Sequence, residues 1–354
     1  MSTRNRDKTE NKVVTQVDVA REAGVTRSMV SYVISGNNER SVAPETRKRI
    51  LDAIEKLGYR PNKAAQALQL GDVELAHRQI GLVLSNDEVF LRPYYTEIIA
   101  GIHTSAHEKN QHIRFIRFFD ELKDPVLFNE LIHREEIGGL ILLACDQSLK
   151  KEEDYQLIEK IKQRIDNIVC VEWKYDGLSS VLFDRSDAAY KACEYLIKHK
   201  FNNIAYIGQN DDRVKGIRES FMEHGKDPMK LYVGLAVDLE GGFLAAKELY
   251  KSSFKFPPAL ICGSDEVAMG VLCFLHENKV SVPDQVSVIS IDNIEMAGYM
   301  NPPLTTVNVQ KNAMGSTAVD MIVSRRGMQG EKAINISLPT EIVERDSVIN
   351  SLYD

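Results

Sequence analysis

The feature that most constrains this chain of 354 residues is a regular alternation that begins near residue 79. Short runs rich in β-branched and aliphatic residues alternate there with longer amphipathic stretches, which is typical of βαβ units and parallel sheets. We expect strands at 80–84, 113–118, 139–143, 168–171, 181–183, 204–207, 232–237, 260–262 and 286–291. We expect helices near 94–109, 125–134, 151–164, 186–199, 211–224, 241–252, 264–278 and 312–325. Because the rhythm restarts at 181, the pattern predicts an α/β fold with two similar lobes within residues 79–347.

Several broad classes of protein are excluded by composition. The first twelve residues are polar, so they are not a secretory signal and we expect a cytoplasmic protein. The longest apolar run, near 140–145, falls far short of the roughly 18 residues that a membrane-spanning helix needs. The five cysteines are scattered and form no C-x-x-C pair, which favours buried thiols over disulfides or a metal site.

Polar side chains follow most of the expected strands, where ligands bind in open α/β sheets. They are Ser85, Asn86, Glu172, Trp173, Asp184, Gln209, Ser264, Asp265, Asp292 and Asn293. This set has one aromatic ring and many hydrogen-bonding groups, so it suits a hydroxyl-rich ligand. The chain has no G-x-G-x-x-G, Walker, G-x-S-x-G or H-E-x-x-H motif, so we expect neither an enzyme nor a cofactor.

A small helical unit at residues 13–60 precedes the α/β part. Thr15 and Asp18 predict a helix start, with Val17, Ala20 and Ala23 on its packing side and Gly24 at its end. Thr26 predicts the start of a second helix, 27–35, whose apolar face would be Met29, Val30 and Val33. A third helix is expected to begin at Pro44 and to end at Gly58.

The charge is divided unevenly along the chain. The net charge is -7, yet residues 1–71 hold 13 basic and 8 acidic side chains, against 31 and 43 in residues 72–354. A basic three-helix unit with a tight turn between its first two helices fits a helix-turn-helix that presents its second helix to DNA. Arg27, Ser28 and Tyr32 are of types that can reach base edges or phosphates, and Ser31, Arg47, Lys48 and Arg49 could hold the DNA backbone. The alternative is a generic three-helix interaction module.

The stretches 14–20, 23–26, 46–50 and 57–68 together resemble the lac repressor (LacI/GalR) family of bacterial transcription regulators. The resemblance implies that residues 61–71 form a hinge helix that folds on DNA, with Leu68 wedged into the minor groove. The DNA-binding residues would then be Thr15, Arg27, Ser28, Ser31, Tyr32, Asn62, Gln66 and Leu68. Tyr32 replaces a common arginine, Met29 a threonine, and Ala43 with Pro44 an expected serine cap, so the operator sequence does not follow from the resemblance.

The resemblance extends into the α/β part, through the stretches 206–208, 262–270, 286–293 and 301–307. It implies the fold of periplasmic sugar-binding proteins, with an effector cleft between the lobes. The effector-binding residues would be Ser85, Pro93, Glu172, Trp173, Arg213, Ser264 and Asp292. Trp173 could equally lie in the core, and Asp265 is expected to cap a helix. The chain lacks the polar residue that the family often carries near Val309 and the aromatic near Lys311.

These observations predict a repressor that binds a near-palindromic operator as a homodimer and responds to a small polar metabolite, most simply a sugar. A sugar-metabolism enzyme with a DNA-binding head is one alternative. A regulator controlled by a partner protein is the other. The C-terminus carries no heptad run, so no coiled-coil tetramer is expected.

Overall fold

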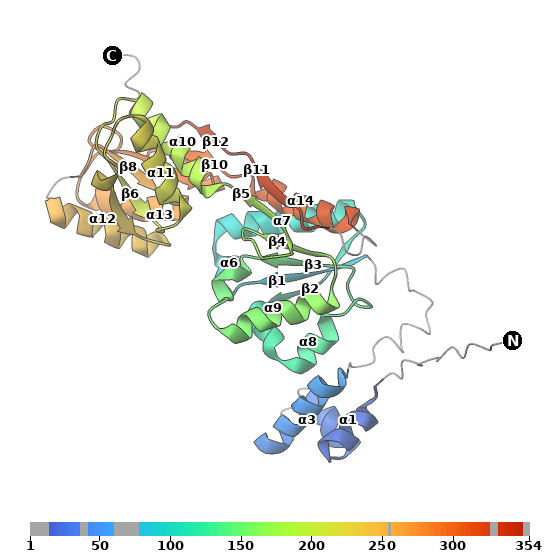
Figure 1. Cartoon of the computed structure of the whole chain (residues 1–354). Helices are drawn as coiled ribbons and strands as arrows, with labels where there is room; N and C mark the ends of the chain where they lie inside the picture. Colours follow the sequence, from blue (N-terminus) through green and yellow to red (C-terminus); the bar gives the residue numbers. More distant parts are fainter. Residues whose placement is uncertain (1–13, 36–41, 60–77, 254–255, 326–331, 350–354) are drawn as a thin grey trace. The chain divides into compact units, whose positions relative to one another are not determined.

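A computed structural model of the chain describes residues 14–35, 42–59, 78–253, 256–325 and 332–349. The chain divides into two compact units (Figure 1). The first comprises residues 1–87, 105–179 and 319–333, and the second 88–104, 180–318 and 334–354. The predicted hinge, 61–71, lies outside the described residues. Among the described residues no helix is long and apolar enough to cross a membrane.

Three short helices form the N-terminal head, as the capping residues predict. They are α1 (Gln16–Ala23), α2 (Arg27–Ser35) and α3 (Pro44–Leu57). Thr15 and Asp18 form a capping box at the start of α1, and Gly24 ends that helix with φ 64°, a conformation that glycine adopts without steric cost. The head core consists of Val19, Ala20, Ala23, Val30, Val33, Ile50, Ala53, Ile54 and Tyr59.

Two of the predicted core positions in the head are wrong. Val17 is 49% exposed because it lies about 200° around the helix from Val19, on the opposite face. Met29 is 41% exposed because it lies at the margin of the buried stripe centred on Val30 and Val33. The apolar character of these two side chains was therefore a poorer guide than their position around the helix.

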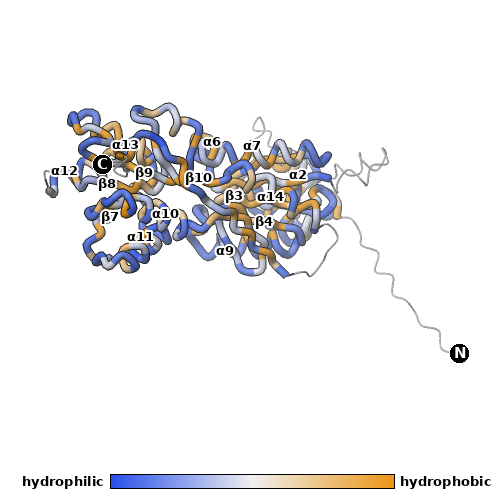
Figure 2. The backbone as a smooth tube through the Cα atoms, turned by 90° about the horizontal axis from the view of Figure 1, so that it is seen from above, coloured by the Kyte–Doolittle hydropathy of each residue, from blue (hydrophilic) through white to orange (hydrophobic). Residues whose placement is uncertain are grey.

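The first unit contains a parallel run of strands in the order β4-β3-β1-β2. Its elements are β1 (Gln79–Leu84), β2 (His112–Phe118), α8 (Pro125–Leu131), β3 (Gly139–Leu143), α9 (Glu152–Arg164) and β4 (Ile168–Val171), with the 3-10 helices η1 (Phe119–Lys123) and η2 (Cys145–Ser148). The strands β3 and β4 are buried throughout, and the hydropathy colouring of Figure 2 shows them as apolar segments.

The second unit is built on a sheet in the order β12-β10-β9-β8-β6-β7. The elements are α6 (Glu88–Leu91), the start of α7 (Pro93–Glu108), β5 (Ser179–Phe183), α10 (Arg185–Lys198), β6 (Ile204–Gly208), α11 (Asp212–Glu223), η3 (Pro228–Lys230), β7 (Tyr232–Leu235), α12 (Leu239–Ser253), β8 (Ala259–Cys262), α13 (Asp265–Glu277), β9 (Ser287–Asp292), η4 (Glu295–Tyr299), β10 (Thr305–Asn308), the start of α14 (Lys311–Ser324), β11 (Asn335–Leu338) and β12 (Glu341–Val343). Only β12 pairs antiparallel in this sheet, with β10.

Every strand and helix expected in the α/β part is present, within a few residues at the ends. The sequence missed α6 and the three late strands β10, β11 and β12, which have only three or four residues each. All five cysteines are free thiols, and four are buried, but Cys273 is exposed, contrary to expectation. Because β6, β8 and β9 are neighbours in a parallel sheet, the loops after residues 208, 262 and 292 lie at one edge.

Candidate functional site

The second helix of the head presents a polar surface. Arg27 and Ser28 are exposed, and Ser31 and Tyr32 are half-buried. The Arg27 guanidinium donates to the Gln16 side chain at 3.4 Å, which ties α2 to α1. On α3, Arg47, Lys48 and Arg49 are exposed as well. The head therefore offers hydrogen-bond donors and positive charge on two of its helices.

Thr15 has a structural role in addition to the one predicted for it. Its hydroxyl donates to the Asp18 carboxylate at 2.6 Å and accepts from the Asp18 amide at 3.4 Å. A phosphate contact from Thr15 would therefore compete with the cap of α1. The remaining predicted DNA-binding residues, Asn62, Gln66 and Leu68, lie outside the described residues.

Arg213 is the most informative residue of the second unit. It lies in the first turn of α11, is 8% exposed, and pairs with Asp211 at 2.5 Å through Nη1. Asp211 also caps the helix by accepting from the Arg213 amide at 3.0 Å. The Nε atom of Arg213 is buried and has no hydrogen-bond partner. An unpaired buried guanidinium donor is costly, so a ligand acceptor at this position would relieve the cost.

Gly216, one turn after Arg213, explains how α11 is positioned. A Cβ atom at this residue would lie 1.9 Å from the Ser186 carbonyl oxygen of α10, closer than any side chain permits. Only glycine lets the two helices approach this closely. Gly216 therefore sets the position of α11, which carries Arg213 in its first turn.

Asp292 ends β9 and is 5% exposed. Its backbone has φ 125°, which is strained for a residue with a side chain. Burial raises the pKa of the Tyr206 hydroxyl, and the charges of Arg213 and Asp292 act on that hydroxyl in opposite directions. Arg213, Tyr206 and Asp292 therefore share one electrostatic neighbourhood.

Arg92 is a part of this neighbourhood that the sequence did not reveal. It pairs with Glu266 at 2.7 Å, donates to the Val237 carbonyl at 3.2 Å, and also feels the charge of Asp292. The predicted residue Pro93, next to it, is half-buried and begins α7. Glu266 is 174 residues away from Arg92 in sequence, so no local pattern could have indicated their ion pair.

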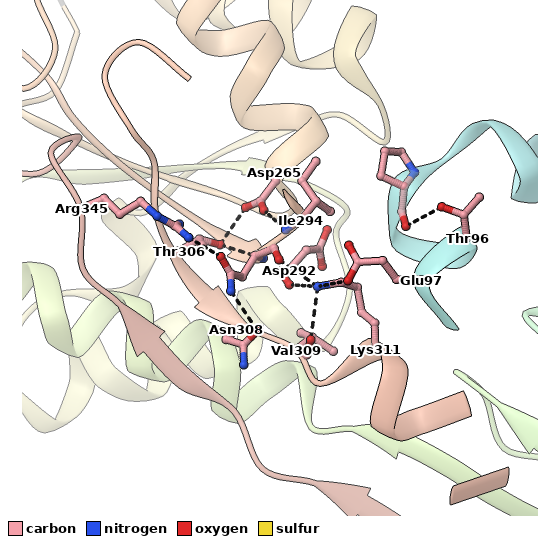
Figure 3. Close-up of polar contacts among 12 residues, drawn as sticks. Thr96, Glu97, Asp265, Asp292, Ile294, Thr306, Asn308, Val309, Lys311 and Arg345 are labelled. Atoms are coloured by element: carbon pink, nitrogen blue, oxygen red, sulfur yellow. Dashed lines mark hydrogen bonds and ion pairs between the residues drawn. The ribbon is translucent and has the colours of Figure 1, made fainter. Parts of the chain in front are cut away.

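Ser264, and not Asp265 as predicted, caps α13. Ser264 caps α13 by accepting from the Val267 amide at 3.2 Å, whereas Asp265 is fully buried. The Asp265 carboxylate accepts hydrogen bonds from Ser290 at 2.5 Å, Thr306 at 2.7 Å and the Ile294 amide at 2.7 Å. Burial raises the pKa of Asp265 to about 6. Asp265 thus fastens β9, β10 and the loop after β9 to α13 (Figure 3).

The other three predicted effector-binding residues belong to the first unit. Ser85 follows β1 and is 2% exposed, and its hydroxyl oxygen has no partner. Glu172 follows β4 with φ 76°. Trp173 lies in the core of the unit, 4% exposed, with its indole donating to the Leu142 carbonyl at 3.0 Å. This is the core alternative for Trp173, so its predicted stacking on a ligand is not what the structure favours.

The part of the chain that the structure describes contains no group of side chains arranged to hold a metal ion. Its two polar sites are an exposed helix-turn-helix surface and a buried cluster of arginines and carboxylates at a sheet edge. Both present polar groups that are suited to binding.

Two family models match the chain. Residues 15–62 match the lacI family of bacterial regulatory proteins, and residues 193–348 match the periplasmic binding protein-like domain. Among curated relatives, the HTH-type transcriptional repressor PurR of Edwardsiella ictaluri is 27% identical over 95% of this chain and 97% of the relative. The repressor of the same name from Yersinia pestis is 29% identical over the same shares.

Solved structures show the same fold. The lac repressor dimer bound to operator and the anti-inducer ONPF has a TM-score of 0.67 at 22% identity, covering 96% of this chain and 100% of that one. The transcriptional regulator CelR in complex with cellobiose has a TM-score of 0.65 at 24% identity, covering 94% and 99%. CcpA of Weissella paramesenteroides with bound glucose has a TM-score of 0.65 at 20% identity, covering 77% and 99%. The chain is therefore similar to transcriptional repressors along nearly its whole length, and it combines a region that matches the lacI family of bacterial regulatory proteins with a periplasmic binding protein-like domain.

Proposed function

We propose that the chain represses transcription as a homodimer on a near-palindromic operator, and that a small polar metabolite, in the first place a sugar, controls its affinity for DNA. Residues 13–60 would read the operator, 61–71 would form the hinge, and 79–347 would bind the effector and the second subunit. Because the coupling is reciprocal, operator binding would change effector affinity by the same factor.

The charge distribution supports DNA contact through the head and hinge alone. Residues 72–354 carry 31 basic and 43 acidic side chains, so this part of the chain repels a phosphate backbone. On α2, the exposed Arg27 and Ser28 are of types that hydrogen-bond to base edges. One head covers about one half-site, which is why a two-fold dimer is proposed.

Exposed apolar side chains of the second unit support the dimer. Leu239 and Leu244 on α12 are 47% and 49% exposed, and Tyr299 on η4 is 85% exposed. A second subunit that covered these side chains would remove their apolar surface from water. We propose that these side chains pack against a second copy of the chain.

The buried Arg213, with Asp292 nearby, is the observation that carries the proposal of a sugar effector. Sugar hydroxyls donate and accept hydrogen bonds, so they match a guanidinium donor and a carboxylate acceptor at once. Both arginines of the cluster already have a carboxylate partner: Arg92 has Glu266, and Arg213 has Asp211. The cluster is therefore suited to an uncharged ligand better than to a phosphate.

The test begins with selection of operator duplexes from a random library by the full chain, followed by fluorescence anisotropy with the selected duplex. Glucose, cellobiose and a panel of other mono- and disaccharides are then added, and sedimentation reports the oligomeric state. We expect a dimer on DNA and a change in operator affinity with at least one sugar. If no sugar of the panel changes the operator affinity, and a captured protein does change it, the proposed sugar effector is refuted.

Replacing Leu68 with alanine should weaken specific operator binding by about tenfold or more, because the wedge supports a kinked duplex with more contacts. Non-specific binding, which rests on phosphate contacts, should change little. Anisotropy titrations with the selected duplex and with a scrambled duplex of equal length measure the two effects. Equal losses on both duplexes would remove Leu68 from the proposed minor-groove contact.

A further inference from the structure

Lys311, the first residue of α14, is a buried cation at the carboxyl edge of the second sheet. It is 3% exposed, and its ammonium donates to the main-chain carbonyls of Asp292 at 2.5 Å, Asn293 at 3.0 Å and Val309 at 3.3 Å. Glu97 of α7 lies 3.4 Å from the same nitrogen (Figure 3). Such a cage of oxygens satisfies all three ammonium protons and leaves none for a ligand.

The carbonyls that Lys311 gathers belong to strained backbone. Asp292 has φ 125° and Asn293 has φ 53°, and both are residues with a Cβ atom. Conformations of this kind cost on the order of 1–3 kcal/mol each and persist only where the surroundings enforce them. The Val309 amide also donates to the Asp292 carbonyl, at 3.3 Å, but it carries no charge.

Other groups hold the rest of this loop in place. The Asn293 side chain contacts Asn308 at 3.1 Å and Arg345 at 2.7 Å, and the Ile294 amide donates to Asp265 at 2.7 Å. These contacts fix the loop from Asn293 onward. Lys311 instead holds the carbonyls of residues 292 and 293, and the first of these residues carries the carboxylate that is placed in the effector site.

Glu97 supplies the countercharge from a different element. Its side chain is 31% exposed, so the pair reaches from α7 to a nitrogen that is almost completely buried. Burial raises the pKa of Glu97, and the charge of Lys311 opposes this effect. Loss of Glu97 would leave the ammonium bound to neutral carbonyls alone, which weakens the cage without removing it.

We propose that Lys311, supported by Glu97, is the positioning residue for Asp292: it holds residues 292–293 in their left-handed backbone conformation and so fixes the direction of the Asp292 carboxylate in the effector site. The part of this proposal that concerns the effector rests on the proposed function. The part that concerns the backbone does not. The chain thus uses a buried cation where the family resemblance leads one to expect an aromatic ring.

Hydrogen exchange of the full chain, read by mass spectrometry, tests the backbone part. K311M leaves three converging carbonyls without their cation, so exchange in a peptide spanning 292–296 should accelerate about tenfold or more. E97Q should accelerate hydrogen exchange in the same peptide by a smaller factor. If K311M does not fold, E97Q alone tests whether the cage holds this backbone. K251M removes a lysine from an exposed pair with Glu248 and should leave this peptide unchanged. No local acceleration in either variant, or equal acceleration along the whole chain, would overturn the proposal.

A double-mutant cycle with D292N tests the link to the effector site, with the sugar of the panel that binds the wild type most tightly as the probe. If Lys311 acts through Asp292, K311M should weaken binding of that sugar about tenfold in the wild-type background and less than about twofold in D292N. Additive losses would show that Lys311 has a purely structural role. If no sugar binds the wild type, the proposed effector class fails, whereas the exchange result still decides the role of Lys311.

Discussion

Replacing Arg213 with alanine should abolish the response to the effector while operator binding survives. The guanidinium is almost completely buried, and one of its donors faces no protein acceptor. Truncating a buried, charged hydrogen-bonding partner typically costs about 2–5 kcal/mol, which corresponds to a loss of roughly 30-fold to several-thousandfold in affinity. Calorimetry with the best-binding sugar, and anisotropy with the selected operator, measure the two quantities separately.

Two further variants show whether the effect belongs to the guanidinium. Arg218 lies on the exposed side of the same helix, so R218A removes an equal charge and should leave the response unchanged. R213K keeps the charge but loses the planar fork, so it should recover only a small part of the affinity. A normal response in R213A, or an equal loss in R218A, would exclude Arg213 from the effector site.

The elements of the fold were predictable because they depend on local signals. Thr15, Gly24 and Pro44 occupy helix ends in the structure as their conformational preferences require. The buried strands were predictable from a local signal as well, because their continuous apolar runs are typical of parallel sheets. Where a strand is short and half exposed, as in β11 and β12, this signal is absent.

The candidate site was only partly predictable, because its contacts join residues that are distant in sequence. Arg213 and Asp292 followed from the family resemblance, and the structure places them in one electrostatic neighbourhood. The ion pair of Arg92 with Glu266 could not be predicted, because nothing in the sequence near either residue indicates the other. For Trp173 the sequence left a ligand contact and a core position open, and packing places the ring in the core.

Asp265 was assigned a local role as a helix cap, and the structure gives it a long-range one. Its neighbour Ser264 already caps α13, which leaves the Asp265 carboxylate to join α13 to β9, β10 and the loop after β9. Sequence shows that a polar residue stands at a helix start. It does not show which of two adjacent residues points into the protein.

Replacing Asp265 with alanine should lower the free energy of unfolding by about 3–5 kcal/mol at pH 6, because three buried donors lose their acceptor. Urea unfolding followed by circular dichroism measures the change. D212A is the matched control, since Asp212 occupies the first turn of α11 but is exposed, and it should cost less than about 0.5 kcal/mol. A loss in D265A no larger than in D212A would contradict the role of Asp265 as the link between these elements.

The pH dependence of the difference in unfolding free energy between the wild type and D265A provides an independent check. The pKa of Asp265 is raised from 3.8 to about 6 by burial, so the folded state binds a proton more tightly than the unfolded state. The stabilisation from this proton is complete below pH 3.8 and is lost as the pH rises through 6, a change of about 3 kcal/mol. The stability advantage of the wild type over D265A should therefore shrink between pH 5 and pH 7. An advantage that grows over this range would mean that the hydrogen bonds from Ser290, Thr306 and Ile294 outweigh burial and hold the carboxylate ionised.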